Sequence, residues 1–192
     1  HGTDLFDLAV KTPIPGLGLV TADADLVAAE LELAHDPKRE HKLQNALRNA
    51  SSRTGYILID CPPSMGLLTL NALVAADSVL VPLQCEFFAL EGISSLIASI
   101  DRTRLHLNPR LVLQGIVLTM YDRRNNLSEQ VAADARAYFG TMVYAAMIPR
   151  NVRVSEAPSH GKPVLLYDFK SPGAQAYVRL AAEFLKRERA VV

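Results

Sequence analysis

Apolar and polar positions along the chain follow two alternating patterns, which predict a succession of strands and helices. Short apolar runs rich in β-branched residues are typical of buried strands, whereas apolar positions three or four residues apart are typical of amphipathic helices. The expected strands are residues 17–22, 56–59, 77–83, 111–120 and 142–148. The expected helices are residues 25–34, 38–49, 64–76, 90–107, 127–139 and 174–189. Strands that alternate with helices predict an α/β fold, with a parallel sheet covered by helices on both faces.

The most informative single stretch is residues 55–64. The apolar run at residues 56–59 ends in one acid, Asp60, and two prolines then turn the chain. Ligands of open α/β sheets bind at the carboxyl ends of the strands. In nucleotide hydrolases of the P-loop class, an acid at this place helps to hold the Mg²⁺ that bridges the β- and γ-phosphates. A helix cap or a loop hydrogen bond is the alternative role for Asp60, and Ser64 is expected to be the N-cap of the following helix.

Composition sets the limits of the possible functions. The 192 residues suffice for one domain or most of one, and the 49% hydrophobic content suffices for a core. Because 20 basic residues balance 20 acidic ones, any contact with nucleic acid must come from a local patch. Cys61 and Cys85 are expected to be buried free thiols in a reducing cytoplasm. No apolar stretch is long enough for a membrane span, and we expect no signal peptide.

One motif that a P-loop ATPase requires is absent. No Gly-x-x-x-x-Gly-Lys-Ser/Thr stretch occurs, and the glycines at positions 16 and 18 are expected to form a turn into a strand. The chain also begins with His1 rather than Met. Our interpretation is that an N-terminal portion with the phosphate loop is not part of this chain.

Four long stretches resemble the motifs of one family. They are DCPPSMGLLTLNAL at residues 60–73, VPLQCEFFALEG at 81–92, LTMYD at 118–122 and IPRNVRVSEAPSHGKP at 148–163. In this order they resemble the ParA/Soj family of chromosome- and plasmid-partitioning ATPases, over about residues 5–185. The resemblance implies a P-loop NTPase-like fold in which residues 1–192 form a single, partial ATPase domain without its N-terminal strand or strands.

The departure from the family pattern affects activity. Family members begin with a strand and the loop Lys-Gly-Gly-Val-Gly-Lys-Thr, and a second strand then ends in an Asp associated with catalysis. Neither motif occurs in this sequence, so the resemblance assigns no catalytic residue here. We therefore expect that this chain alone does not bind or hydrolyse ATP competently, since phosphoryl transfer depends on these positioning elements.

The resemblance implies roles for residues around the first motif. Asp60 corresponds to the Walker B acid, which acts on Mg²⁺ through a water molecule. Pro62, Pro63, Ser64 and Gly66 correspond to the switch segment that senses the γ-phosphate. The structural alternative for the same residues is a rigid turn from strand to helix, to which the two prolines are suited.

Two further sites follow from the later motifs. Met120, Pro149 and Asn151 are expected to line the adenine pocket, where a proline packs on the purine and an amide pairs with the base edge. Arg124 and Arg153 match surface arginines that bind DNA non-specifically through its phosphates. Neighbouring cations that could extend this patch are Arg123, Lys162 and Lys170. The alternatives are an ordinary loop for the first site and solvated surface residues for the second.

The resemblance implies a function for the intact protein. It would bind ATP and Mg²⁺, form an ATP-dependent homodimer, bind DNA non-specifically and be stimulated by a ParB-type partner. The place would be the bacterial cytoplasm, in association with the nucleoid and without a membrane. One alternative is a relative that positions another cargo, as MinD does. The other is a degenerate, non-catalytic interaction module, which the sequence upstream of His1 would distinguish from a truncated chain.

Overall fold

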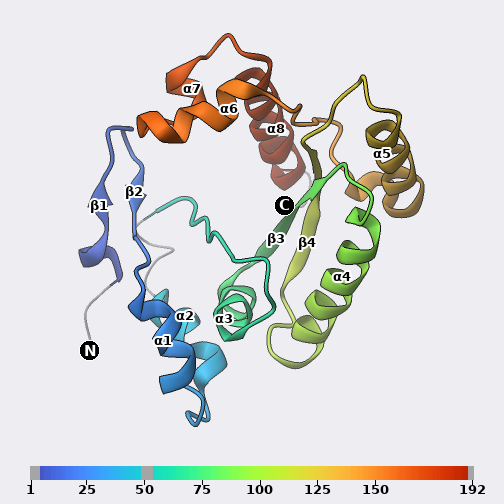
Figure 1. The fold of residues 1–192 in the computed structure, drawn as a ribbon. Helices are drawn as coiled ribbons and strands as arrows, with labels where there is room; N and C mark the ends of the chain where they lie inside the picture. Colours follow the sequence, from blue (N-terminus) through green and yellow to red (C-terminus); the bar gives the residue numbers. More distant parts are fainter. Residues whose placement is uncertain (1–4, 49–53, 190–192) are drawn as a thin grey trace. The chain divides into compact units, whose positions relative to one another are not determined.

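The computed structural model describes residues 5–48 and 54–189, which divide into two compact units (Figure 1). The first unit comprises His1–Ser78 and Ser99–Val112, and the second comprises Val79–Ala98 and Leu113–Val192. Strand β3, helix α4 and strand β4 pass from one unit to the other. The prediction of one partial domain stays a prediction.

The first unit begins with a small hairpin that the sequence pattern did not predict. After a 3-10 helix at Leu5–Leu8, strand β1 (Val10–Lys11) pairs antiparallel with β2 (Gly18–Leu19). The hydroxyl of Thr12 donates to the carbonyl of Leu17 at 2.9 Å and closes the loop, in which Gly16 has a φ of +78°. The expected strand at residues 17–22 is thus reduced to two residues.

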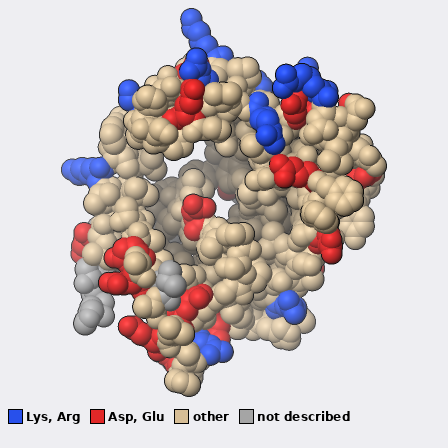
Figure 2. All heavy atoms as spheres, in the orientation of Figure 1, with Lys and Arg blue, Asp and Glu red and all other residues tan. Residues whose placement is uncertain are grey.

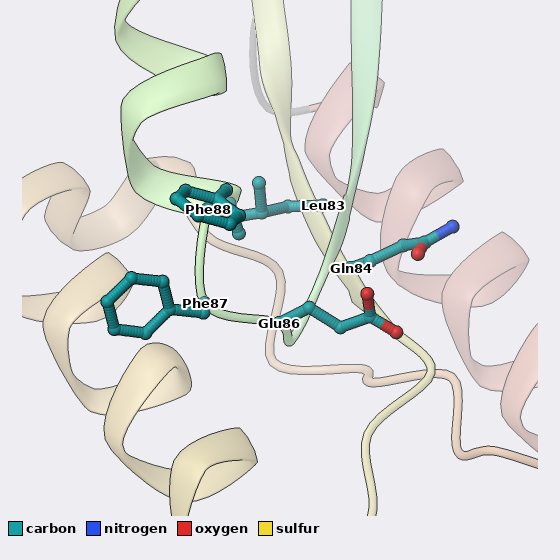
Figure 3. Close-up of a pocket in the computed structure, with 6 residues that line it drawn as sticks. Leu83, Gln84, Glu86, Phe87 and Phe88 are labelled. Carbon is teal, nitrogen blue, oxygen red and sulfur yellow. The ribbon is translucent and has the colours of Figure 1, made fainter.

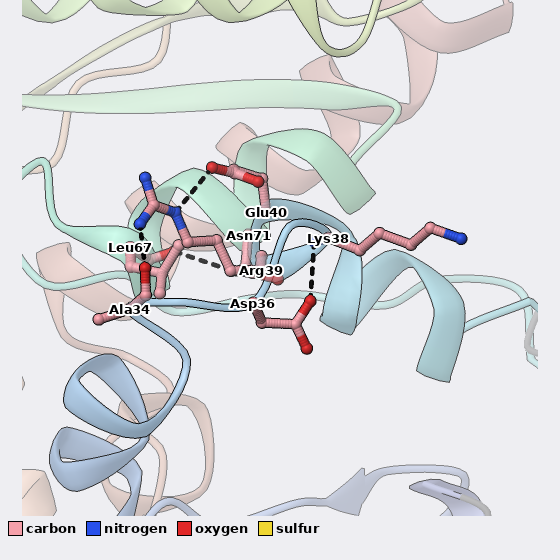
Figure 4. A network of polar contacts seen from close by, with 7 residues as sticks. All are labelled: Ala34, Asp36, Lys38, Arg39, Glu40, Leu67 and Asn71. Carbon is pink, nitrogen blue, oxygen red and sulfur yellow. Dashed lines mark hydrogen bonds and ion pairs between the residues drawn. The ribbon is translucent and has the colours of Figure 1, made fainter.

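Helices α1 and α2 of the first unit lie on either side of a polar turn. Helix α1 is Asp25–Glu32, and a 3-10 turn at Arg39–His41 leads into α2, Lys42–Ala46. The carboxylate of Asp36 accepts a hydrogen bond from the amide of Lys38 at 2.8 Å (Figure 4). The same carboxylate pairs with the ammonium of Lys42. These contacts stabilise the turn, because the first backbone N–H groups of a helix have no acceptor within the helix itself. The predicted helix end at Asn49 lies outside the described residues.

Helix α3, Leu67–Ala75, is the best anchored element of the first unit. The amide of Asn71 donates to the carbonyl of Arg39 at 2.8 Å (Figure 4). The Asn71 side-chain oxygen accepts from the backbone N–H of Leu43 at 3.1 Å. At the other end, the amide of Asn108 donates to the carbonyls of Leu73 and Ala76 at 3.0 and 2.8 Å. Buried amides that satisfy backbone groups fix the position of a helix more sharply than apolar contacts alone.

The predicted strand at residues 56–59 is not formed. Residues 56–60 have no regular secondary structure, and the Leu58 side chain is 89% exposed. The physical reason is that a strand forms only against a neighbour that accepts and donates its backbone hydrogen bonds. No segment of the described chain pairs with residues 56–59.

The second unit is built on β3 (Ser78–Gln84) and β4 (Val112–Thr119), which pair in a two-stranded sheet and lie in this unit except for the first residue of each. Two parallel bridges, Ile116 to Val143 and Tyr121 to Pro149, continue the pairing beyond β4. The expected strand at residues 142–148 is therefore present only as these two bridges. A 3-10 turn at Gly140–Met142 replaces its start.

Helices cover both faces of this sheet, as the pattern predicted. Figure 1 shows α8 (Pro172–Arg189) on one side of the strands, with α4 (Ala89–His106) and α5 (Asn126–Phe139) on the other. Under α8, the core joins the side chains of Val117, Tyr144, Ile148, Ala176, Leu180 and Phe184. The fold is therefore α/β, of the P-loop NTPase type.

Two short helices were not predicted: α6 at Val152–Glu156 and α7 at Val164–Tyr167.

A close approach of Tyr144 to β4 depends on one glycine. A Cβ atom at Gly115 would lie 2.6 Å from the Tyr144 ring and from the carbonyl oxygen of Met142, and its φ is +148°. Only glycine tolerates both conditions. On the ring of Tyr144 lies the guanidinium of Arg187, 3.8 Å from the centroid.

Candidate functional site

Asp60 lies at the end of the irregular segment at residues 56–60, and Asp60 is exposed to solvent. Within the parts of the chain that the structure describes, no group of three or more His, Cys, Asp or Glu side chains is placed to hold a metal. Asp60 is therefore a single exposed carboxylate and is not part of a cluster of possible metal ligands in the described chain. Cys61 was expected to be buried and is exposed, whereas Cys85 is buried as expected. Desolvation by nearby protein atoms, together with the charge of Asp60, raises the pKa of the Cys61 thiol.

The switch segment leads directly into α3, and a residue that we did not predict supports it. Gly66 is the N-cap residue, and no side chain at that position caps the helix. Glu30 of α1 supplies the acceptor instead, because its Oε1 accepts a hydrogen bond from the backbone N–H of Leu68 at 3.1 Å. A Cβ atom at position 66 would lie 2.7 Å from the same oxygen, so a larger residue there would displace the Glu30 side chain.

Ser64 does not cap α3, contrary to the prediction. Its carbonyl oxygen accepts a hydrogen bond from the hydroxyl of buried Thr69 at 2.6 Å, and Gly66 takes the N-cap position two residues later. The switch segment is therefore tied to α3 by Thr69, while Glu30 satisfies the first turn of the helix. The general need of first-turn amides for acceptors was foreseeable, but which distant acid meets it depends on tertiary structure.

The predicted adenine-binding residues of the second unit come together at the carboxyl ends of the strands. The backbone N–H of Tyr121 donates to the carbonyl of Ile148 at 3.1 Å, and that of Arg150 donates back to Tyr121 at 3.0 Å. This pairing brings the backbone after Met120 alongside Pro149. Met120 has a φ of +53°, which is uncommon for a residue with a side chain and often occurs at functional sites.

Asn151 carries a buried acceptor without a partner. Its Oδ1 atom is buried and makes no hydrogen bond to any described residue. The side chain packs against Gly173 at the start of α8, where a Cβ atom would lie 3.1 Å from Oδ1 and 2.4 Å from a methyl of Val154. Because an unpaired buried carbonyl oxygen is costly, a donor group of a ligand would be stabilised there.

Two cavities open in the second unit, and neither is lined by Pro149 or Asn151. One has a volume of about 460 Å³ and is lined by Cys85, Glu86, Phe87, Met120, Asp122, Asn125, Leu127, Ser128 and Arg150. The other, of about 310 Å³, lies beside an exposed aromatic pair, Phe87 and Phe88, whose rings meet edge to face (Figure 3). Figure 3 shows these rings on one side of the backbone, with the side chains of Gln84 and Glu86 on the other. The sequence motif identified this stretch but did not predict that both rings would be exposed.

Both predicted DNA-binding arginines are already paired with carboxylates. The guanidinium of Arg124 donates to both oxygens of Asp122 at 3.1 Å, and its side chain is 89% exposed. The hydrogen bonds from Arg124 lower the pKa of Asp122, and the same pair raises the pKa of Arg124. Arg153 pairs with Glu156 at 2.8 Å, which raises the pKa of Arg153.

Cations and acids are interleaved on this surface. Figure 2 shows Lys and Arg side chains next to Asp and Glu over the α6–α7 region and near the loop before α5. Across the described residues, no ion pair is found for Arg123, Lys162 or Lys170. Of the five cations named for the DNA-binding patch, the two arginines predicted to bind DNA have ion pairs, and the three neighbouring cations have none among the described residues.

Three kinds of comparison place the chain among known proteins. A family model described as an AAA domain matches residues 2–113. The chromosome partitioning protein ParA of Caulobacter vibrioides is 62% identical over 185 residues, which cover 95% of this chain and 69% of that protein. The sporulation initiation inhibitor protein Soj of Bacillus subtilis is 48% identical over 180 residues, covering 94% of this chain and 71% of Soj.

Solved structures agree with this relationship. A structure titled cobyrinic acid a,c-diamide synthase from Mycobacterium smegmatis, with bound ADP and magnesium, has a TM-score of 0.82 and 34% identity. The match covers 99% of this chain and 70% of that one. The cell division ATPase MinD of Pyrococcus furiosus has a TM-score of 0.74 at 23% identity, covering 96% of this chain and 71% of MinD, which shows a shared fold.

No helix of the described residues is long and apolar enough to cross a bilayer.

Proposed function

The chain belongs to the ParA/Soj family of chromosome-partitioning ATPases, and from this premise we propose that it acts in the segregation of a bacterial chromosome or plasmid. In this function it binds ATP with Mg²⁺, forms an ATP-dependent homodimer and binds DNA without sequence preference. A ParB-type partner stimulates hydrolysis, and the site of action is the cytoplasm, in association with the nucleoid.

The observation that carries the nucleotide part is the unpaired, buried Oδ1 of Asn151. It lies two residues beyond Pro149, which is bridged to the residue after Met120. An exocyclic amine of a purine is a donor of the kind this acceptor lacks, and Pro149 offers an apolar surface for the ring face. The M. smegmatis structure, which holds ADP and magnesium, supports the same ligand class.

The residues of this chain fit part of the nucleotide. Asp60 would hold Mg²⁺ through a water molecule, and Asn151 and Pro149 would orient the base. The 192 residues contain no Gly-rich Lys-Thr loop for the phosphates. When bound, ATP supplies the phosphoryl bond whose hydrolysis resets the protein. The residues of the switch segment, Pro62 to Gly66, would respond to the γ-phosphate, and the hydrogen bond from Thr69 to Ser64 would transmit that response to α3.

A chimera tests the nucleotide assignment. A strand and the Lys-Gly-Gly-Val-Gly-Lys-Thr loop of the family pattern are joined ahead of residue 1, and binding of a fluorescent ATP analogue is measured with Mg²⁺. We expect Asn151→Leu to weaken binding about tenfold, because a hydrogen bond to the base is lost without a change in side-chain size. Asn126→Leu, an exposed asparagine on α5, is the matched control. Equal binding by the chimera and its Asn151→Leu variant would show that this residue does not contact the base.

The DNA assignment is tested in the same chimera with ATP at low salt. Arg124→Glu combined with Arg153→Glu is expected to abolish binding to random duplex DNA, because two phosphate contacts are replaced by repulsion. The charge-matched control is Arg102→Glu with Arg104→Glu on α4. Binding that survives in the first double variant would contradict the assignment of these arginines.

A further inference from the structure

Arg153 is held by two carboxylates from different short helices. Its Nη1 donates to Oε2 of Glu156 at 2.8 Å within α6, and its Nε lies 3.4 Å from Oδ2 of Asp168, which follows α7. The hydroxyl of Tyr167 donates to the same Glu156 oxygen at 3.3 Å. We name Glu156 and Asp168 the carboxylate clamp.

The clamp is fixed by its surroundings independently of Arg153. The carbonyl oxygen of Asp168 accepts from the hydroxyl and the N–H of Ser171, at 2.8 and 3.1 Å, and its own N–H donates to Val164. Tyr167, which orients Glu156, stacks on the ring of His160 with centroids 4.8 Å apart. The two carboxylates are therefore positioned before any ligand arrives, and Arg153 is bound between them.

While Arg153 is paired with both carboxylates of the clamp, the net charge of the three side chains is unfavourable for binding DNA. One guanidinium faces two carboxylates, so the formal sum is −1, although Arg153 itself is 52% exposed. Exposed ion pairs are weak and can exchange partners in water. Two oxygens of a phosphate can accept a bidentate pair of hydrogen bonds from a guanidinium, as the two oxygens of a carboxylate do. A phosphate can therefore take Arg153 from the clamp, but only in competition with it.

We infer that Glu156 and Asp168 compete with the phosphates of duplex DNA for Arg153, and that they thereby set the affinity and the salt dependence of DNA binding. This inference rests on the proposed DNA-binding function. Arg123, Lys162 and Lys170, which have no ion pair within the described chain, make their phosphate contacts without such competition. Arg124, which is paired with Asp122, must likewise be released. The surface thus divides into cations that bind directly and two arginines that must first leave a carboxylate, of which only Arg153 is held by two.

The exchange has a measurable signature in salt. A cation that binds a phosphate releases a counterion, and each contact adds about one unit to the slope of log K against log salt. When Arg153 leaves the clamp, the two freed carboxylates take up cations from solution. This uptake offsets the counterions that the DNA releases, so the contact of Arg153 contributes little to the slope in the natural sequence.

The test removes the clamp and retains the shape of both side chains. Random duplex DNA is titrated by fluorescence anisotropy with the 192-residue chain and, in parallel, with the ATP-loaded chimera. We expect Glu156→Gln with Asp168→Asn to bind about threefold to tenfold more tightly at 50 mM salt, with a slope about one unit steeper. Glu129→Gln with Asp134→Asn, two exposed acids on α5, removes the same charge without touching an arginine.

The possible outcomes separate the clamp from the function on which it rests. If both double variants gain equally, the effect is one of net charge and the clamp is refuted. If Arg153→Glu leaves the affinity of the natural sequence unchanged, Arg153 contacts no phosphate and the inference fails while DNA binding stands. If neither the chain nor the chimera binds DNA in any variant, the proposed DNA function itself is contradicted. Single Glu156→Gln and Asp168→Asn variants with unchanged melting temperatures guard against a loss of fold.

Discussion

Two apolar segments of similar composition have opposite fates in this molecule. Residues 56–59, Tyr-Ile-Leu-Ile, and residues 79–83, Val-Leu-Val-Pro-Leu, both carry the pattern of a buried parallel strand. In β3, Val81 and Leu83 are 4% and 6% exposed. In the other segment, Leu58 is 89% exposed and no strand forms. The same pattern therefore leads to a buried strand in one place and to exposed coil in the other.

The difference lies in where the backbone hydrogen bonds go. The N–H of Val112 donates to Asp77 and that of Cys85 donates to Thr119, at 3.0 and 3.1 Å, at the two ends of the β3–β4 pair. The amides of residues 57–59 make no hydrogen bond to any described residue. An apolar run thus specifies that a strand can be buried, but a neighbouring strand decides whether it is.

We expect the largest difference in unfolding free energy between a leucine-to-alanine substitution in a buried strand and the same substitution in the exposed segment. Leu118→Ala, in β4 and fully buried, is expected to lower the free energy of unfolding by ~3–4 kcal/mol, because it removes packed methyl groups and leaves a cavity. Leu58→Ala should change it by less than ~0.5 kcal/mol. Urea denaturation followed by circular dichroism measures both. Equal losses would mean that residues 56–59 are buried in solution.

The exposed segment around Leu58 should also make the chain associate. Exposed apolar side chains next to free backbone groups pair readily with another chain. We expect sedimentation at micromolar concentration to give an average mass above the 21.0 kDa of one chain. Leu58→Lys should weaken this association at least tenfold, which corresponds to ~1.4 kcal/mol. Leu31→Lys is the control, because Leu31 is 81% exposed but lies in a helix. A monodisperse natural chain would contradict this prediction.

Residues 143–149 are an intermediate case, since they are bridged to the β4 side at only two points and a side chain binds the backbone between these points. The carboxylate of Glu183 accepts from the N–H groups of Ala145 and Ala146 at 3.0 and 2.9 Å and pairs with Arg187. Partial burial alone would raise the pKa of Glu183, but these hydrogen bonds outweigh it and lower the pKa. We expect Glu183→Gln to cost ~1–2 kcal/mol at pH 7.

The pH dependence of that cost follows from the direction of the shift. A carboxyl group whose pKa is lowered on folding stabilises the fold above its unfolded pKa, and this contribution is lost as pH falls through the folded pKa. The difference in unfolding free energy between the natural chain and Glu183→Gln should therefore shrink between pH 5 and pH 3. Asp134→Asn, exposed on α5, serves as the control. A difference that stays constant with pH would exclude a charged Glu183 as the source.

The smallest effect on stability is expected at the start of α3. Glu30→Ala removes the acceptor for the Leu68 amide and should cost ~1 kcal/mol, as for the loss of a helix cap. Hydrogen exchange at Leu68 should become faster, whereas Glu32→Ala on the same helix should change neither quantity. Unchanged exchange at Leu68 would show that another group caps α3 in solution.

The sequence predicted the elements whose patterns are local and long. Strands β3 and β4 and helices α4, α5 and α8 lie within a few residues of their expected bounds, because each carries its own hydrophobic periodicity. The hairpin of β1 and β2 and the short helices α6 and α7 were missed, because a few residues carry too little periodic pattern. The carboxylates of Glu30, Glu156 and Glu183 act on groups that only the folded chain brings near, and sequence spacing could indicate at most the Arg153–Glu156 pair.

The exposed segment at residues 56–60 also bears on the lifetime of the protein. Proteases bind their substrates as extended strands, and cleavage of a folded protein concentrates in exposed, irregular backbone. Residues 56–60 satisfy this requirement without any unfolding, whereas β3 and β4 would first have to separate. Limited digestion should therefore cut within this segment first. In a cell, any chain that supplied a pairing strand would prolong the protein's half-life by occupying the same backbone groups.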